Sequence, residues 1–284
     1  MTELSKQITQ EEIIDIHPTS GWSALKLREL WRYRELMFFL TWRDIKVRYK
    51  QTLLGAAWAI IRPLVTMIVF TLIFGRVAKL DSEGMPYQLF SFTALLPWQL
   101  FSKALSDTSN SMVANRNMIT KIYFPRLVIP FSSIISGLVD FGIAFVILIG
   151  MMFYYGVKPT SAIWTLPLFL VLALLTALGV GLWFSALNVQ FRDVGYLIPF
   201  LTQVWLYATP VAYSAQIVSP KWQAVYALNP MAGVVQGFRW ALLGTDLGAN
   251  ASLTLSLSVL ISILILISGL FYFRRMERTF ADVV

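Results

Sequence analysis

The sequence contains no cysteine and only one histidine, His17, which lies in its polar N-terminal stretch. Without cysteine, the chain forms no disulfide and no thiolate metal site. The phosphate-binding pattern G-x-x-x-x-G-K-[S/T] is absent, and so are H-E-x-x-H and G-x-S-x-G. These absences remove the usual motifs for ATP hydrolysis, zinc proteolysis and serine hydrolysis. We therefore expect no catalytic residue, no metal site and no cofactor in this chain, and do not expect it to act as an enzyme by itself.

Charged residues are also scarce. They make up 13% of the 284 residues, hydrophobic residues make up 57%, and the mean hydropathy is +0.66. Soluble domains have roughly 25% charged and 45–50% apolar residues. The apolar residues gather in blocks of roughly 20, enough for a helix to cross about 30 Å of hydrocarbon. The composition therefore predicts an all-α membrane protein.

Six apolar blocks are long enough to span a membrane: Leu53–Gly75, Tyr87–Leu105, Leu127–Tyr155, Trp164–Leu187, Val194–Tyr213 and Leu253–Phe273. Most of the basic residues behind the net charge of +8 fall on the side of these blocks that carries both chain ends. The positive-inside rule then places both termini in the cytoplasm. The other side holds only Arg76, Lys79, Lys158, Lys221 and Arg239. We expect a cytoplasmic segment at 1–52, a six-helix transmembrane domain at 53–273 and a cytoplasmic tail at 274–284.

Two stretches depart from simple spans. In residues 21–50, aromatic and basic residues interleave, which predicts one or two amphipathic helices lying in the cytoplasmic interface. The alternative is a solvated linker with an aromatic anchor. In residues 214–250, prolines and glycines cut an apolar stretch into two short helices, about Lys221–Leu228 and Met231–Leu243. We expect these to form a re-entrant hairpin between spans five and six, against the alternative of an ordinary outer loop.

Charged residues inside the apolar blocks need a reason. Arg62 and Pro63 interrupt the first block. Either a kink or helix boundary near Pro63 marks the true start of the span, or the span is continuous and Arg62 faces a hydrated entrance. Asp140 lies within the third block, where a bare charge costs at least about 2.5–3.5 kcal/mol. We expect Asp140 to pair with a polar or basic group, Arg62 being one candidate, unless it serves as a proton relay.

The loop between the second and third spans carries a short apolar face around Lys121, bounded by polar residues and by Pro125. This pattern predicts a short helix around Lys121, parallel to the membrane on its cytoplasmic side. Such a helix suits docking into a groove of a soluble partner.

Aromatic residues are concentrated in spans one, two and five. Most aromatic residues in spans face lipid or anchor at the headgroups; the alternative is that they stack on sugar rings along a transport path. The path candidates are Trp58, Phe70, Phe74, Phe90, Trp98, Phe101, Trp205, Tyr207 and Tyr213, together with Arg62.

Six short motifs keep one order along the chain from about residue 35 onward. They are Arg48-Tyr49-Lys50 with Leu54-Gly55, Trp58 and Pro63; Leu96-Pro97-Trp98 with Phe101; Asn117-Met118-Ile119-Thr120-Lys121 with Phe124-Pro125; Asn188 with Arg192-Asp193; Thr209-Pro210 with Tyr213; and Asn229-Pro230. In these motifs the chain resembles the permease subunits of ABC-type polysaccharide exporters, which include O-antigen, capsule and teichoic acid exporters.

The resemblance implies a homodimer of six-span subunits in the bacterial inner membrane, with two separate ATPase subunits that bind ATP and Mg. It implies that a lipid-linked glycan, typically on undecaprenyl diphosphate and most often O-antigen, passes outward between the permeases. It also implies that the following residues couple to the ATPase: Arg43, Asn115, Asn117, Ile119, Lys121, Ile122 and Phe124. The alternatives are an exporter of small molecules or drugs with the same architecture and, from the enzyme class, a membrane glycosyltransferase or acyltransferase.

Overall fold

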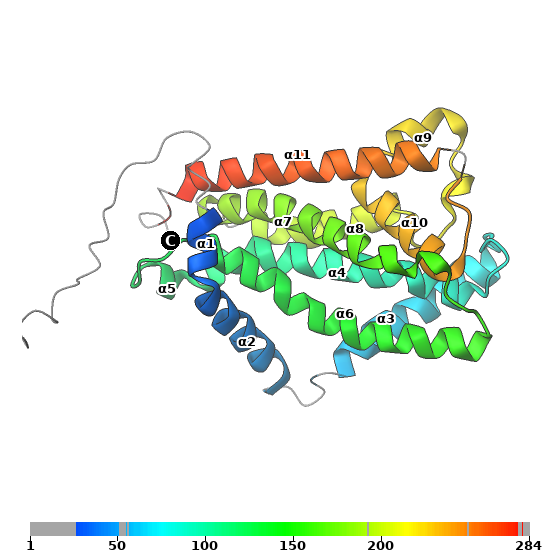
Figure 1. Ribbon diagram of the computed structural model, residues 1–284, viewed down its shortest axis with the longest axis horizontal. Helices are drawn as coiled ribbons and strands as arrows, with labels where there is room; N and C mark the ends of the chain where they lie inside the picture. The colour runs from blue at the N-terminus through cyan, green and yellow to red at the C-terminus, as the bar shows by residue number, and fades with distance from the viewer. Residues whose placement is uncertain are drawn as a thin grey trace, which may run out of the picture.

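The computed structural model describes residues 27–50, 55, 57–191, 193–248, 250–277 and 280, and every regular element among them is helical. Figure 1 shows an elongated bundle whose long helices run along its length. The predicted all-α class is confirmed. The elements are α1 (Leu27–Arg32), α2 (Arg34–Lys50), α3 (Ala57–Phe70), the π-helix η2 (Thr71–Val77), α4 (Tyr87–Ala114), α5 (Arg116–Ile119), α6 (Val128–Tyr155), η3 (Ser161–Thr165), α7 (Leu166–Gln190), α8 (Val194–Ala208), η4 (Ala215–Ile217), α9 (Pro220–Tyr226), α10 (Pro230–Leu243) and α11 (Ala251–Glu277).

Some predictions fall on residues outside the described part of the chain. They concern His17 and the rest of residues 1–26, Leu53 and Leu54, Arg192, and most of the predicted tail after Glu277.

Four helical stretches of the described residues are long and apolar enough to cross a membrane: Ala57–Val77, Val128–Tyr155, Ser161–Gln190 and Ala251–Glu277. They correspond to predicted spans one, three, four and six. The two other predicted spans differ from these for separate reasons. Helix α8 is apolar but has only 15 residues, because its backbone leaves the helix at Thr209, before Pro210. Helix α4 has 28 residues but a more polar composition.

Helix α4 is the central helix of the bundle, in contact with α3, α6, α7, α8 and α10. It buries most of its side chains, including hydroxyls such as those of Thr93 and Ser111, which donate to backbone carbonyls of their own helix. A helix shielded by other helices needs no apolar outer surface. Its helical structure also continues past the predicted end at Leu105 to Ala114, because the polar residues there face protein.

Helix α3 runs without a break from Ala57 through Pro63, which is buried. The helix boundary near Pro63, one of the two alternatives, is therefore absent, and the helix continues through Pro63 as the other alternative requires. Next to Pro63, the carbonyl of Arg62 accepts a bond of 2.9 Å from the Thr66 hydroxyl. The irregular part of the span lies further on, in η2, where Ala78 N–H donates to Ile73 O over 2.8 Å.

Helices α7 and α11 approach each other closely at two glycines. A methyl group at Gly179 would lie 2.6 Å from the backbone nitrogen of Leu266, and one at Gly269 would lie 2.3 Å from the carbonyl oxygen of Gly179. One turn away, the hydroxyls of Thr176 and Ser262 share a hydrogen bond of 2.7 Å. Small residues and hydroxyl pairs of this kind join helices where burial of apolar surface gives no advantage over lipid.

The two ends of the bundle differ. Helices α1 and α5 and the C-terminal end of α11 lie at one end, and α9 and η2 lie at the other (Figure 1). At the first end, Arg126 donates its backbone N–H to the Glu277 carboxylate and its guanidinium to the Glu277 backbone carbonyl. Arg274 pairs with the same carboxylate over 2.7 Å. The loop after α5 is therefore fastened to the end of α11.

The two short helices predicted near the second end are present as α9 and α10. Helix α10 is almost wholly buried against α4, α7 and α11, whereas α9 lies on the outside, with Trp222 and Val225 exposed. The interface region likewise forms two helices. Helix α2 buries Leu40 against the bundle, and its Thr41 hydroxyl donates to Ser132 O of α6.

Candidate functional site

A cleft of about 820 Å³ opens between α3, α4, α6 and α8, beside the C-terminal end of α2. Apolar and aromatic surface forms most of its lining, and a few charged residues lie among it. The lining residues that matter for its chemistry are Arg48, Tyr49, Trp58, Arg62, Trp98, Lys103, Asp107 and Asp140.

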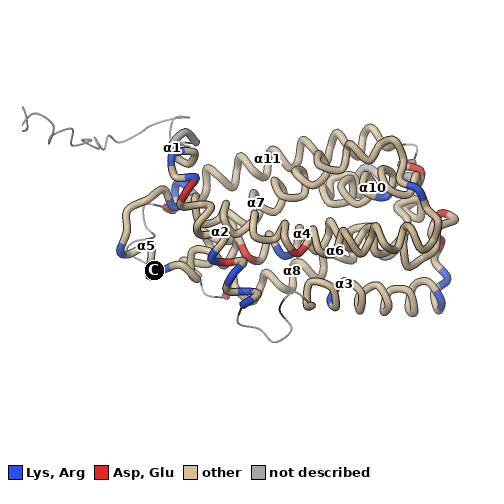
Figure 2. Tube along the Cα trace, turned by 60° about the horizontal axis from the view of Figure 1, so that its bottom comes forward, with Lys and Arg blue, Asp and Glu red and all other residues tan. Residues whose placement is uncertain are grey.

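Four of these residues form a charge cluster, in which each acid contacts both bases. The Arg48 guanidinium lies 2.9 Å from Asp140 and 3.3 Å from Asp107. The Lys103 ammonium lies 3.0 Å from Asp107 and 3.8 Å from Asp140. Figure 2 shows basic and acidic segments close together where α2, α4 and α6 meet. The two positive and two negative charges offset one another, so the Asp140 carboxylate of α6 is not an unpaired charge inside the bundle.

Asp140 therefore has a basic partner, as expected, but that partner is Arg48 rather than Arg62. The reason is geometric, because α2 lies across α6 and brings its last turn beside Asp140. The Tyr49 hydroxyl also donates to Asp140. Burial, and then the neighbouring carboxylate, raise the pKa of Tyr49 to about 12, so the hydroxyl keeps its proton at neutral pH.

Arg62 occupies another part of the cleft. Its side chain is exposed, and its guanidinium carbon lies 5.9 Å from the centre of the Trp58 ring, within the range of a cation–π contact. Trp98 lines the same cleft and packs on Phe101, with ring centres 5.3 Å apart. The cleft thus offers an exposed cation beside the exposed Trp58 indole, whereas Trp98 is buried with 4% exposure.

The structure brings Trp58, Arg62 and Trp98 together at the cleft and places the other path candidates elsewhere. Those in the core or packed against it are Phe70 and Phe74, which contact each other at 5.4 Å, Phe90, and Phe101 with Trp205, at 4.9 Å. Tyr207 is exposed on α8, and its carbonyl accepts from the Tyr213 hydroxyl over 3.0 Å.

A helix is present in the predicted docking region, but it is shorter than predicted: α5 has four residues, Arg116–Ile119. Arg43 of α2 donates to the Asn115 side chain over 2.8 Å, and that amide donates in turn to Ser111 O. The coupling candidates divide by exposure. Ile119 and Phe124 are buried, whereas Asn117, Lys121 and Ile122 are exposed. Tyr123, which was not among the candidates, is also exposed, at 75%, beside Ile122 at 61%.

Arg239 was assigned to an outer segment as one of the few cations there, but it is buried inside α10 with 2% exposure. Its guanidinium donates to the carbonyls of Pro210 and Val211 at 2.7 Å each, and to those of Tyr213 and Phe90 at 3.1 and 3.3 Å. It also lies 3.5 Å from the centre of the Phe90 ring. Arg239 therefore binds the backbone that unwinds after α8.

Asn229 explains two of the quoted motifs. Its side-chain oxygen accepts from Met231 N–H, capping α10, and from the indole of Trp205. Its amide donates to Ala208 O and to the Thr209 hydroxyl. The Thr209-Pro210 and Asn229-Pro230 motifs thus form one junction between the end of α8 and the start of α10.

Sequence reasoning missed Lys103 and Asp107 as site residues. Both lie near the predicted end of span two, where charges are expected anyway, so they drew no attention. A signal was present, because their spacing of four residues places them on one face of a helix.

Residues 35–243 match the ABC-2 type transporter family of membrane domains. The chain belongs to the ABC-2 type transporter family. Among its curated relatives is an O-antigen export system permease protein RfbA of Klebsiella pneumoniae, 29% identical over 254 residues, which are 88% of this chain and 95% of the relative. A protein of the same name from Myxococcus xanthus is 30% identical over 75% of this chain and 82% of its own.

The polysialic acid transport protein KpsM of Escherichia coli is similar at 24% identity over 74% of this chain and 82% of its own. The family match begins within α2 and ends at Leu243, the last residue of α10. It therefore includes the cleft, the docking region and the α8–α10 junction, and it makes this ABC-2 chain a multi-pass membrane protein.

Proposed function

We propose that this chain is the transmembrane permease subunit of an ATP-driven exporter that moves a lipid-linked polysaccharide, of the O-antigen class, out across the bacterial inner membrane. The observation that carries the proposal is the similarity to O-antigen export permeases over 88% of this chain. The cleft supports it, because an exposed arginine beside the Trp58 indole suits a ligand that combines an anionic group with sugar.

In this proposal the chain spans the membrane six times, with both termini in the cytoplasm. Helices α4 and α8 supply the second and fifth spans; at about 1.5 Å per residue, the 28 residues of α4 exceed 30 Å. Helix α8 falls short of that length, and the segment bound by Arg239 and α10 completes the crossing. The pair α9–α10 then forms a re-entrant hairpin from the outer side, its polar backbone shielded by protein.

Helix α2 lies in the cytoplasmic interface. Its exposed side chains Phe38, Phe39 and Trp42 face the acyl boundary, where aromatic rings are favoured.

Two ATPase subunits, which bind ATP and Mg, drive a homodimer of this permease. The exposed pair Ile122 and Tyr123 after α5 docks on the ATPase. The hydrogen bond between Arg43 and Asn115 ties this docking region to α2, and α2 carries Arg48 to the cleft. A movement of the ATPase is thereby passed through one helix to the charge cluster.

The cleft receives the lipid-linked end of the glycan. Arg62 contacts the diphosphate, since its guanidinium is exposed in the cleft and Arg pairs with phosphate in bidentate geometry. Trp58, which is 47% exposed, stacks on the first sugar ring, and the polyprenyl chain stays in lipid.

Deletion of the gene tests the proposal in cells. We expect surface glycan to disappear, lipid-linked glycan to accumulate inside, and drug sensitivity to stay unchanged. Complementation with the wild-type gene restores surface glycan, whereas Arg62→Glu does so at less than a tenth of its level. Normal surface glycan together with raised drug sensitivity would instead identify a small-molecule exporter of the same family.

A further inference from the structure

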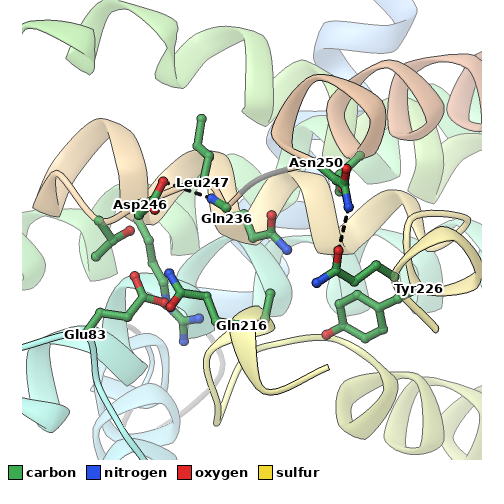
Figure 3. Close-up of a pocket in the computed structure, with 13 residues that line it drawn as sticks. Glu83, Gln216, Tyr226, Gln236, Asp246, Leu247 and Asn250 are labelled. Atoms are coloured by element: carbon green, nitrogen blue, oxygen red, sulfur yellow. Dashed lines mark hydrogen bonds between the residues drawn. The ribbon is translucent and has the colours of Figure 1, made fainter. Parts of the chain in front are cut away.

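A second cavity, of about 300 Å³, lies at the α9 end of the bundle, opposite the end that carries α5 (Figures 1 and 3). We call it the polar pocket. The loop before α4, η4, α9, α10 and the start of α11 each contribute to it. Its volume is at the lower end for ligand sites, about 300–1,000 Å³, which suits one or two sugar rings.

Hydrogen-bonding side chains dominate the lining. It holds the carboxamides of Gln216, Gln223, Gln236 and Asn250, the carboxylates of Glu83 and Asp246, and the hydroxyls of Thr245, Thr254 and Tyr226. Figure 3 shows labelled members of this set arranged around one space. A lining so rich in neutral polar groups is unlike the apolar, aromatic cleft, and it points to a ligand with many hydroxyl groups.

Several of these groups lack a protein partner. Gln223 and Asn250 bond each other over 2.6 Å, but the carboxamides of Gln216 and Gln236 make no hydrogen bond to any residue that the structure describes. Glu83 accepts from the Ser214 hydroxyl with one carboxylate oxygen, while the other is buried without a partner among the described residues. A buried acceptor without a partner raises the free energy of the folded protein, so a ligand that donates a hydroxyl here would recover that cost.

The charges in the pocket select against an anion. Arg239 lines it, but its guanidinium is already bound to four backbone carbonyls. Its donors are therefore occupied, and its one positive charge stands against the two carboxylates of Glu83 and Asp246, so the lining is negatively charged overall. Carboxylates and amides accept hydrogen bonds from the hydroxyls of a sugar. Glu83 and Asp246 would repel a ligand that itself carries a carboxylate.

We propose that the polar pocket is a binding subsite for a neutral, uncharged sugar unit of the glycan that leaves the transporter. This inference rests on the proposed export function and adds a substrate class to it. Gln216 and Gln236 donate to and accept from ring hydroxyls, and Glu83 accepts from one. The site is chemically opposite to the cleft, where Arg62 suits the anionic end of the same molecule.

Sugar binding to the permease–ATPase complex in nanodiscs tests this subsite directly. The probes are D-glucose, D-galactose, D-mannose, L-rhamnose and N-acetyl-D-glucosamine, with D-glucuronate as the anionic comparison, followed by saturation-transfer NMR. We expect at least one neutral sugar to bind at millimolar concentration and glucuronate at least fivefold more weakly. Gln236→Leu and Gln216→Ala should each reduce neutral-sugar binding at least fivefold.

Two controls separate the outcomes. Gln190→Ala changes an exposed glutamine outside the pocket, at the far end of α7, and should bind sugar like the wild type. Gln216 is exposed as well, so its replacement does not threaten folding, and co-purification of the ATPase reports on the fold of each variant.

The inference is overturned if no neutral sugar binds, if glucuronate binds as well, or if both pocket variants bind like the wild type. Failure of the export proposal looks different, because the deletion strain would then keep its surface glycan. If deletion removes surface glycan while the pocket variants bind and export normally, only the pocket assignment is wrong.

Discussion

Arg48 shows how a single side chain connects the interface helix to the membrane domain. It pairs with one acid on α6 and another on α4, in the cluster that Lys103 completes. Each member is about a quarter exposed, so its charges are screened less than surface charges but are not fully desolvated. The cluster therefore holds α2 in place without making it immovable.

A double-mutant cycle measures that link. We expect Arg48→Met and Asp140→Asn each to lower the free energy of unfolding, and their effects to be coupled by about 0.5–3 kcal/mol, because the two side chains are bonded. The control cycle uses Arg62→Met with Asp140→Asn and should be additive within about 0.5 kcal/mol. Thermal unfolding in detergent gives both values. If the Arg48 cycle is additive and the Arg62 cycle is coupled, Asp140 pairs with Arg62, one of the candidates from the sequence, and not with Arg48.

Arg239 is the other residue whose removal should be costly. In Arg239→Met the carbonyls of Pro210, Val211 and Tyr213 lose a charged donor. The burial of the guanidinium itself has a cost that offsets part of this loss, and we expect a net destabilisation of about 2–4 kcal/mol. Arg76→Met removes an exposed arginine near the same end and should change stability by less than about 0.5 kcal/mol. Equal unfolding temperatures for the two variants would show that Arg239 does not hold this backbone.

At the scale of elements, the bundle depends on small residues where helices cross. Gly179→Ala would place a methyl group 2.6 Å from the Leu266 backbone, which cannot move as a side chain can. We expect a destabilisation of about 1–3 kcal/mol as α7 and α11 separate. Gly150→Ala on α6 is the matched control, because nothing lies within 4 Å of its new methyl group. If the yields of folded protein from the two variants agree, the α7–α11 contact is looser than described.

In the docking region, substitutions of exposed and of buried residues should have different effects. Ile122→Glu alters an exposed side chain, so we expect at least a tenfold loss of co-purifying ATPase from a permease that remains folded. Ile119→Glu buries a charge within the permease and should lower its stability as well. Ile217→Glu, equally exposed at the opposite end of the bundle, should retain the ATPase. Retention of the ATPase by Ile122→Glu would place the docking surface elsewhere.

Apolar blocks and prolines in the sequence predicted the helices well where contact with lipid or a proline sets the end of the helix. Helices α6 and α11 lie close to the predicted blocks, and prolines correctly separated α9 from α10. The polar continuation of α4 was not predicted, because hydropathy cannot distinguish a polar loop from a polar helix buried by its neighbours. For the same reason, the burial of Arg239 was not predicted, although four backbone carbonyls surround its guanidinium.

At the scale of the whole molecule, the sites lie along one axis. The docking region lies at one end, the cleft with its cation and indoles lies between α3 and α6, and the polar pocket lies at the other end (Figure 1). The motifs predicted the family, and the pattern around Lys121 predicted a short helix, which is present as α5. Which aromatic residues line the cleft could not be predicted. Phe90, Trp98 and Phe101 all lie in α4, and only the packing of the neighbouring helices decides that Trp98 alone of the three lines the cleft.

Reconstitution tests the central claim most directly. Proteoliposomes would contain the permease, its ATPase subunits and a fluorescent lipid-linked glycan, and protection of the glycan from an external glycosidase would be measured. We predict that ATP added outside protects the glycan only when both subunits are present, and that the permease alone hydrolyses no ATP. An active complex that hydrolyses ATP while all of the glycan stays exposed would contradict the assignment of this chain as a glycan-export permease.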